Sequence, residues 1–287
     1  MILSADTTDR LLGRFGPIML AVPGIAFIFL FFVVPVAIIL VQSVLDQGFT
    51  LGFYKRLFSA PEYLDVVAIT FKIALITSVI SMLVSYPVAY LLVVAPPAVR
   101  AVMFTAILLP FWTNVLIRCY AWMLILQTNG IVNDLLVNWL HVFTAPLPLV
   151  FNLTGLVIGM VHYIVPINIL VLYSVMKAID LRLLQAAKGL GANPLRAFAA
   201  VFIPLSMPGV RASGMLIFVI ALGFFVMPAL LGGNREITVA MLVSTYFSEV
   251  LNWGFGSALA VVLLAFSSVG LFFYFMFQRK VALAGPK

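Results

Sequence analysis

The chain has 287 residues, of which 64% are apolar and 9% are charged, and its formal net charge is +7. Ordinary globular proteins are about 45–50% apolar and about 25% charged, so the polar residues here are too few to cover a soluble fold. This composition excludes a soluble enzyme, a nucleic-acid-binding protein and a disordered chain, and it predicts an all-α, polytopic membrane protein. The single cysteine, Cys119, excludes an internal disulfide and a cysteine-based metal site, and two histidines are few for a metal centre.

Six stretches of the sequence are long and apolar enough to cross a membrane, because a spanning helix needs about 20 mostly apolar residues. They cover residues 17–41, 66–94, 101–126, 153–176, 206–232 and 256–278. The first follows Arg10 and Arg14, but it is too long for the apolar core of a cleaved signal, so we expect a retained helix. Residues 130–141 are shorter and carry Asp134, which favours an interfacial helix. We therefore expect one transmembrane domain over residues 1–287.

The positions of Lys and Arg predict which side of the membrane each connection faces, because cytoplasmic connections carry an excess of both. With a cytoplasmic N-terminus, most of them lie inside: Arg10, Arg14, Arg100, Lys177, Arg182, Lys188, Arg196, Arg211, Arg279, Lys280 and Lys287. Fewer lie outside or near the outer ends of spans: Lys55, Arg56, Lys72, Arg118 and Arg235. We therefore expect both termini in the cytoplasm.

The longest cytoplasmic connection, residues 177–204, carries signals for a helix that lies on the membrane face. Asp180 can cap a short amphipathic helix over residues 181–190. Gly191 follows directly and can take the positive φ that ends such a helix. The small side chains along this helix leave a surface that another protein can bind.

A second helix is expected to follow at once. Asn193 can serve as its cap, and Pro194 fits its first turn, where a missing N–H costs nothing. We expect this helix to run through Phe202 and to stop at Pro204, ahead of the fifth span. The connection therefore predicts a helix–turn–helix on the cytoplasmic face.

Part of this connection reads Gln185-Ala186-Ala187-Lys188-Gly189-Leu190-Gly191, followed by Ile203-Pro204-Leu205. This run resembles the cytoplasmic EAA loop of ABC-importer permeases, whose pattern is Glu-Ala-Ala, three residues, Gly and, after a longer gap, an Ile-Pro pair. The spacing fits that pattern. Gln185 stands where the family has Glu, so this position can offer a hydrogen bond but not a charge.

Residues 109–122, 225–233 and 253–258 extend the resemblance. They read Leu-Pro-Phe-Trp-Thr-Asn-Val-Leu-Ile-Arg-Cys-Tyr-Ala-Trp, Phe-Val-Met-Pro-Ala-Leu-Leu-Gly-Gly and Trp-Gly-Phe-Gly-Ser-Ala. These segments are similar to the corresponding parts of spermidine/putrescine-type permeases. With the EAA-like loop, they cover most of the chain from the second span onward.

The resemblance implies a type I ABC-importer permease fold with a cytoplasmic coupling helix, in a bacterial inner membrane. It implies two copies of a cytoplasmic ABC ATPase, a second homologous permease, an extracytoplasmic solute-binding protein and surrounding lipid, with no nucleic acid. The chain has no Gly-x-x-x-x-Gly-Lys-Ser/Thr phosphate loop, so we expect no cofactor and no enzyme activity in it, and ATP and Mg on the partner ATPase. The residues expected to couple to that ATPase are Gln185, Ala186, Ala187, Gly191, Asn193 and Pro194.

Side chains for a solute path are expected in the third and fifth spans. Asn114, Arg118 and Trp122 recur every four residues, which places them on one face of a helix. An Arg within a span is costly, and Arg118 fits two roles equally well, a structural bond to carbonyl groups of the bundle or a place on the path. Pro228 is a candidate for an outer gate. The full set of path candidates is Trp112, Asn114, Arg118, Tyr120, Phe225 and Pro228.

The predicted function is that of a transmembrane subunit of an ATP-driven importer for a small polar organic solute, with spermidine or putrescine as the expected cargo. The middles of the spans hold no Asp or Glu, which counts against a cationic cargo unless aromatic faces or the partner permease compensate. One alternative is the same machinery serving an amino-acid derivative, an opine, a phosphonate or a metal complex. A second is an ion-gradient-driven secondary transporter, although the mid-membrane ionisable residues and inverted repeats of that class are not evident. An intramembrane enzyme has no His, Asp, Glu or Ser constellation to support it.

Overall fold

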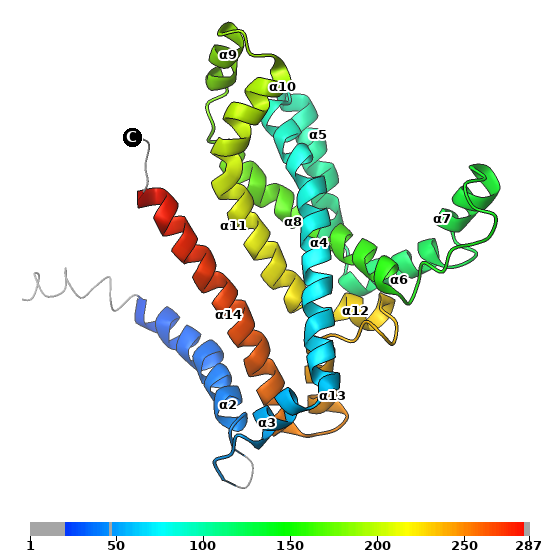
Figure 1. The fold of residues 1–287 in the computed structure, drawn as a ribbon, viewed down its shortest axis with the longest axis vertical. Coiled ribbons are helices and arrows are strands. Elements are labelled where there is room, and N and C mark those ends of the chain that lie inside the picture. Colours follow the sequence, from blue (N-terminus) through cyan, green and yellow to red (C-terminus); the bar gives the residue numbers. More distant parts are fainter. Residues whose placement is uncertain (1–20, 46–47, 284–287) are drawn as a thin grey trace, which may run out of the picture.

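The computed structural model describes residues 21–45 and 48–283, with side chains described as far as Phe272. Within these residues the helices form an elongated bundle from which one arm projects sideways (Figure 1). The predicted start of the first span at residue 17, together with Arg10, Arg14, Asp46 and Lys287, lies outside the described residues.

Six helical segments of the described chain are long and apolar enough to cross a membrane, which makes this a multi-pass membrane protein. They are Ala21–Gln42, Pro61–Val94, Val115–Trp139, Leu153–Met176, Pro194–Leu222 and Trp253–Phe272. Two shorter apolar helices, Pro97–Trp112 and Val239–Ser248, lie between them. The predicted number of spans is confirmed, whereas the course of the third and the fifth differs from the prediction.

The first half of the chain contains η1 (Phe29–Val33), α2 (Val34–Gln42), α3 (Gly52–Ser59), α4 (Pro61–Val94), α5 (Pro97–Leu108), η2 (Leu109–Trp112), α6 (Val115–Leu126), α7 (Ile131–Asp134) and η3 (Leu135–Trp139). The second half contains α8 (Leu153–Met176), α9 (Arg182–Gly189), α10 (Pro194–Ala197), η4 (Phe198–Phe202), α11 (Ile203–Leu222), α12 (Val226–Leu231), α13 (Val239–Ser248) and α14 (Trp253–Leu283). The helix expected within residues 130–141 is present as α7 and η3.

The centre of the bundle consists of α4, α8 and α11, which pack along one another (Figure 1). Ser85 Oγ of α4 donates to Val165 O of α8 at 3.3 Å. α11 also approaches α8 closely at Gly209. A Cβ at that position would lie 2.7 Å from Cγ1 of Val175 on α8. Small residues let helix backbones approach closely in a membrane, and α4 buries a whole row of them: Thr70, Ala74, Thr77, Ser78, Ser81, Ser85 and Ala89.

The predicted third span, residues 101–126, is wrong as a single helix. The chain is helical through η2, becomes extended at Thr113 (φ −96°, ψ 137°) and starts α6 after Asn114. Pro110 lacks the N–H that a continued helix needs, and the Asn114 side chain accepts a hydrogen bond from Leu116 N at 2.8 Å, which caps a new helix. α6 therefore leaves α5 at an angle and leads into the arm formed by α7 and η3 (Figure 1).

The predicted fifth span, residues 206–232, is also interrupted and begins earlier than expected. α11 ends at Leu222, and three residues separate it from α12. At the other end, Pro204 does not stop the preceding helix, which is continuous from Pro194 to Leu222. Just before Pro204 the chain forms the π-helix η4, in which Ile203 N donates to Phe198 O. The proline then falls in the first turn of α11, and the wider π turn before it accommodates the proline within the continuous helix.

The first span lies outside the central bundle. α2 packs mainly against α14, at the edge of the molecule away from the arm (Figure 1). None of the most apolar part of this span is buried by the rest of the described chain. Its apolar surface is therefore presented to lipid or to another protein.

Candidate functional site

The connection between α8 and α11 forms a helix–turn at one end of the bundle, with α9 as its outermost element (Figure 1). Asp180 Oδ1 accepts a hydrogen bond from Arg182 N at 2.9 Å, which supports the start of α9. The helix ends at Gly191, whose φ is +90°. Ala192 N donates to Ala187 O at 3.1 Å and Gly191 N donates to Lys188 O at 3.0 Å, which is the Schellman arrangement. The expected helix end at Gly191 is confirmed.

The second helix of the connection also begins where the sequence indicates. Asn193 Oδ1 accepts from Arg196 N at 2.7 Å, and Pro194 occupies the first helical position. The predicted cap and the predicted proline position are therefore both confirmed.

The outer surface of this connection is unusually apolar for an exposed turn. Leu190 is 91% exposed and Leu195 is 79% exposed, and Leu183 is exposed as well. Gln185 and Ala186 of the EAA-like run are exposed, whereas Ala187 is half-buried. Leu184 is only 8% exposed, because it packs inward against the bundle. The connection is thus anchored by one leucine and presents several others outward.

A second cluster of predicted residues lies where α5–η2 gives way to α6. Asn114 caps α6, and Arg118 Nη2 donates to Thr113 O at 2.8 Å. The guanidinium carbon of Arg118 lies 5.1 Å from the centre of the Tyr163 ring on α8, which is within cation–π range. Nε of Arg118 is buried without a hydrogen-bond partner among the described residues.

This cluster continues to the other helix break. The Tyr163 ring packs edge-on against Phe224, 4.8 Å between centres, and Phe224 lies in the segment between α11 and α12. Trp122, one turn beyond Arg118, packs edge-on against His162 at 5.4 Å. Tyr163 therefore connects α8 to the break before α6, through Arg118, and to the break between α11 and α12, through Phe224. His162 adds a second contact between α8 and α6, through Trp122. Sequence reasoning missed these two residues, because an aromatic within an apolar span carries no pattern that marks it.

The remaining path candidates do not form one group. Trp112 is 90% exposed, and Tyr120 and Phe225 are exposed too. Pro228 is buried within α12. Next to it, the Cys119 thiol donates a hydrogen bond to Sδ of Met227, with 3.2 Å between the two sulfur atoms.

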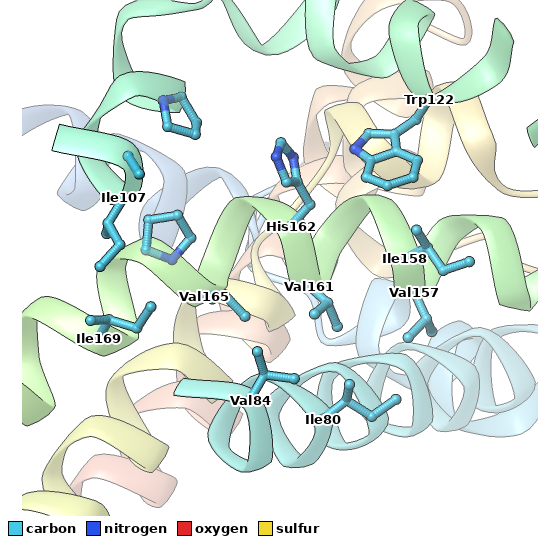
Figure 2. A pocket seen from close by; sticks show the side chains of 13 residues that line it. Ile80, Val84, Ile107, Trp122, Val157, Ile158, Val161, His162, Val165 and Ile169 are labelled. Carbon is cyan, nitrogen blue, oxygen red and sulfur yellow. The ribbon is translucent and has the colours of Figure 1, made fainter. Parts of the chain in front are cut away.

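An apolar cavity of about 510 Å³ lies between α4, α5, α6 and α8. Figure 2 shows Ile80 and Val84 of α4 facing Val157 and Val161 of α8, with His162 and Trp122 on the other side of α8. Nδ1 of His162 is buried and has no hydrogen-bond partner within the described part of the chain. The cavity is lined by aliphatic side chains together with His162 and Trp122.

Comparison with known proteins places this architecture among the membrane subunits of ABC transporters. The chain matches a solved bacterial alginate ABC transporter in complex with an alginate pentasaccharide-bound periplasmic protein, with a TM-score of 0.79 and 14% identity over 95% of this chain and 97% of that one. No family model matches the sequence. The fold is accordingly that of an ABC-transporter permease subunit.

Curated relatives narrow the class. The spermidine/putrescine transport system permease protein PotB of Escherichia coli (strain K12) is 33% identical over 237 residues, which are 83% of this chain and 86% of the relative. PotB of Haemophilus influenzae is 35% identical over 238 residues, 82% of each chain. The chain belongs to the family of spermidine/putrescine transport system permease proteins.

Proposed function

We propose that this chain is one of two homologous permease subunits in an ATP-driven importer of spermidine or putrescine. Its family carries the proposal for the cargo, since the curated relatives are permeases of spermidine/putrescine transport. The chain has no phosphate loop of its own, so we propose that a separate ATPase supplies the energy. The exposed α9–α10 connection supports this proposal as the surface that the ATPase would contact.

We assign the ATPase contact to the connection around α9. Exposed leucines on a protruding turn favour a surface that another protein covers, and Leu183, Leu190 and Leu195 provide one. The residues Gln185, Ala186, Ala187, Gly191, Asn193 and Pro194 lie within this surface. Each of the two permeases would present one such connection to one of two ATPase copies, and ATP and Mg would be bound there.

We further propose that α9 and both chain termini face the cytoplasm of a bacterial cell, with the inner membrane around the bundle. The excess of Lys and Arg in the α9–α10 connection supports this orientation. An extracytoplasmic solute-binding protein would then deliver the cargo at the opposite end, where α3 and α13 lie (Figure 1).

The cargo is cationic, and the spans as described hold no carboxylate at their middles. Aromatic faces attract ammonium groups, and Phe224 and the exposed Trp112 and Tyr120 provide them near the helix breaks. Carboxylates that complete the path would come from the second permease.

The test is purification of the chain in mild detergent, identification of the chains that co-purify, and spermidine uptake by vesicles that contain the complex. We expect an ATPase, a second permease and a binding protein, with ATP-dependent uptake. Recovery of the chain alone as a working transporter contradicts the proposal. If a phosphonate or an opine competes for uptake and spermidine does not, the same machinery serves another solute.

A variant that lacks residues 185–191 tests the ATPase contact separately. We expect it to insert in the membrane and to import nothing, because the surface of α9 is gone. The wild-type chain, expressed to the same level, is the control. Continued uptake by the deletion variant would disprove the assignment of the contact.

A further inference from the structure

We propose that α4 transmits movement across the membrane to α13. The movement starts at the α9 connection, which the ATPase displaces. The two contact points are the Tyr90 ring near one end of α4 and the Tyr63 hydroxyl near the other. The inference rests on the proposed function, in which an ATPase moves α9.

The inner contact joins α4 to the π-helix that follows α9 and α10. The Tyr90 ring packs edge-on against Phe198 at 4.9 Å and against Phe202 at 4.8 Å. Phe198 and Phe202 stack on one another, with 5.5 Å between centres and 14° between planes. Phe202 is completely buried. A displacement of η4 must therefore move the Tyr90 ring, because the three rings are closely packed and leave no empty space between them.

The ATPase-facing helix reaches the same cluster. Leu184, the one buried side chain of α9, belongs to the hydrophobic core that contains Phe202, with Phe198 and Tyr90 packed against it. The Tyr86 hydroxyl, one turn before Tyr90, lies 2.7 Å from Ser206 Oγ, which ties α4 to the start of α11. A push on α9 is thus passed to α4 through side chains, although the backbone of the connection leads to α8 and α11.

α4 is suited to transmit this movement because it is long and continuous. It runs from Pro61 to Val94, and Pro87 is its one internal proline. Between Tyr63 and Tyr90, at 1.5 Å rise per residue, the helix spans about 40 Å. α5–α6 is interrupted part of the way along, and the helix that is continuous from Pro194 ends at Leu222, before α12. α8 is continuous but shorter, and it packs along α4.

The outer contact joins α4 to α13 by hydrogen bonds. The hydroxyls of Tyr63 and Tyr246 lie 2.8 Å apart, and Thr70 Oγ1 accepts from Val239 N at 2.9 Å. Arg56 Nη2 donates to the Tyr63 hydroxyl at 3.2 Å, and its guanidinium lies 4.7 Å from the Phe255 ring centre. Burial, followed by the bond to Tyr63, raises the pKa of Tyr246 above its usual 10.0. Movement of α4 is therefore passed on to α13.

The experiment reconstitutes the whole complex in vesicles with spermidine-loaded binding protein and measures spermidine imported per ATP hydrolysed. Tyr90→Leu removes the inner ring contact, and Tyr246→Phe removes the outer hydroxyl–hydroxyl bond while it keeps the ring and the bond from Val239 N to Thr70 Oγ1. We expect each to lower the imported spermidine per ATP about fivefold, the smallest effect typical of coupling between sites.

Two matched controls lose contacts of the same kind that do not involve α4, although they lie in the same two hydrophobic clusters. Phe104→Leu removes an edge-on contact of 4.9 Å between α5 and Tyr173, and Tyr54→Phe removes a 2.8 Å hydroxyl bond to Ser43. Both should retain the wild-type ratio. Unchanged ratios in Tyr90→Leu and Tyr246→Phe overturn the role of α4, and so does an equal fall in the controls.

A double variant guards against a general loss of structure. Tyr63→Phe and Tyr246→Phe remove the same hydrogen bond, so the combined variant should be no worse than Tyr63→Phe alone. Additive losses would show that the bond is not the link. A wild-type complex that hydrolyses ATP without importing spermidine contradicts the proposed function instead, and the variants are not needed to see it.

Discussion

Nη2 of Arg118 donates a 2.8 Å hydrogen bond to the carbonyl oxygen of Thr113, five residues earlier in the chain. Thr113 is the extended residue between η2 and α6, and its carbonyl is one that a continuous helix would have paired internally. The guanidinium also covers the Tyr163 ring. One side chain thus stabilises the break in the third predicted span and fixes α6 to α8.

Arg118→Ala should destabilise the protein by about 1–3 kcal/mol, because the Thr113 carbonyl loses a charged donor and Tyr163 loses its cation. The measurement is the midpoint of thermal unfolding in detergent. Arg118→Lys keeps the charge without the planar guanidinium and should recover part of the loss. An unchanged midpoint in Arg118→Ala contradicts the structural role.

Gly191→Val should weaken ATPase binding and uptake. A side chain at φ +90° costs about 1–2 kcal/mol, because the left-handed region brings Cβ close to the backbone. The surroundings contribute no clash, since a Cβ at Gly191 meets no atom within 4 Å. Co-purification of the ATPase is the measurement.

Gly189→Ala is the matched control for this change. Gly189 is the last residue of α9, has no positive φ and has equally open surroundings. The variant should bind the ATPase as the wild type does. If Gly191→Val behaves like Gly189→Ala, the turn geometry is not what the partner needs.

Gly209→Ala should destabilise the bundle by about 1–3 kcal/mol, because the added Cβ would lie 2.7 Å from Cγ1 of Val175. Unfolding in detergent measures the effect. Gly214→Ala, where the nearest atom is the flexible Met82 Cε at 3.4 Å, should be tolerated. Val175→Ala should relieve part of the loss in Gly209→Ala, because it removes Cγ1 and Cγ2 but leaves the Cβ of residue 175, which would lie 2.8 Å from the added Cβ. No relief at all would argue against the α8–α11 contact.

Asn193→Ala should loosen α10, because the Arg196 amide loses its 2.7 Å bond to the Asn193 side chain. The loss of an N-terminal cap costs about 1 kcal/mol. Faster hydrogen exchange at the Arg196 amide is the expected observation. Asn193→Asp retains an acceptor and should exchange as slowly as the wild type.

Features that depend on neighbouring residues alone could be predicted from the sequence. The cap at Asn193, the helix end at Gly191 and the hydrogen bond from Arg182 N to Asp180 all follow from side-chain chemistry within a few positions. The six apolar segments follow from the length that a bilayer requires. Such signals survive folding because no distant contact competes with them.

Features that depend on what lies opposite a helix were missed or misplaced. Pro204 reads as a stop, but a π turn before it lets the helix continue. Residues 101–126 read as one span, but the chain bends at Thr113 and its carbonyl is satisfied by Arg118. In apolar segments almost every residue fits a helix, so the sequence gives little warning of where a break is stabilised.

The sequence by itself determined that the chain is a multi-pass membrane protein with a helix–turn–helix connection rich in basic residues, because composition and local capping leave few other outcomes. Only the tertiary structure decided which helices are continuous and which side chains connect them. Tyr90 meets Phe198 and Phe202, and Tyr63 meets Tyr246, across separations in the chain that no periodicity records. These pairs exist because close packing brings α4 against η4 at one end and against α13 at the other, and packing is a property of the folded bundle.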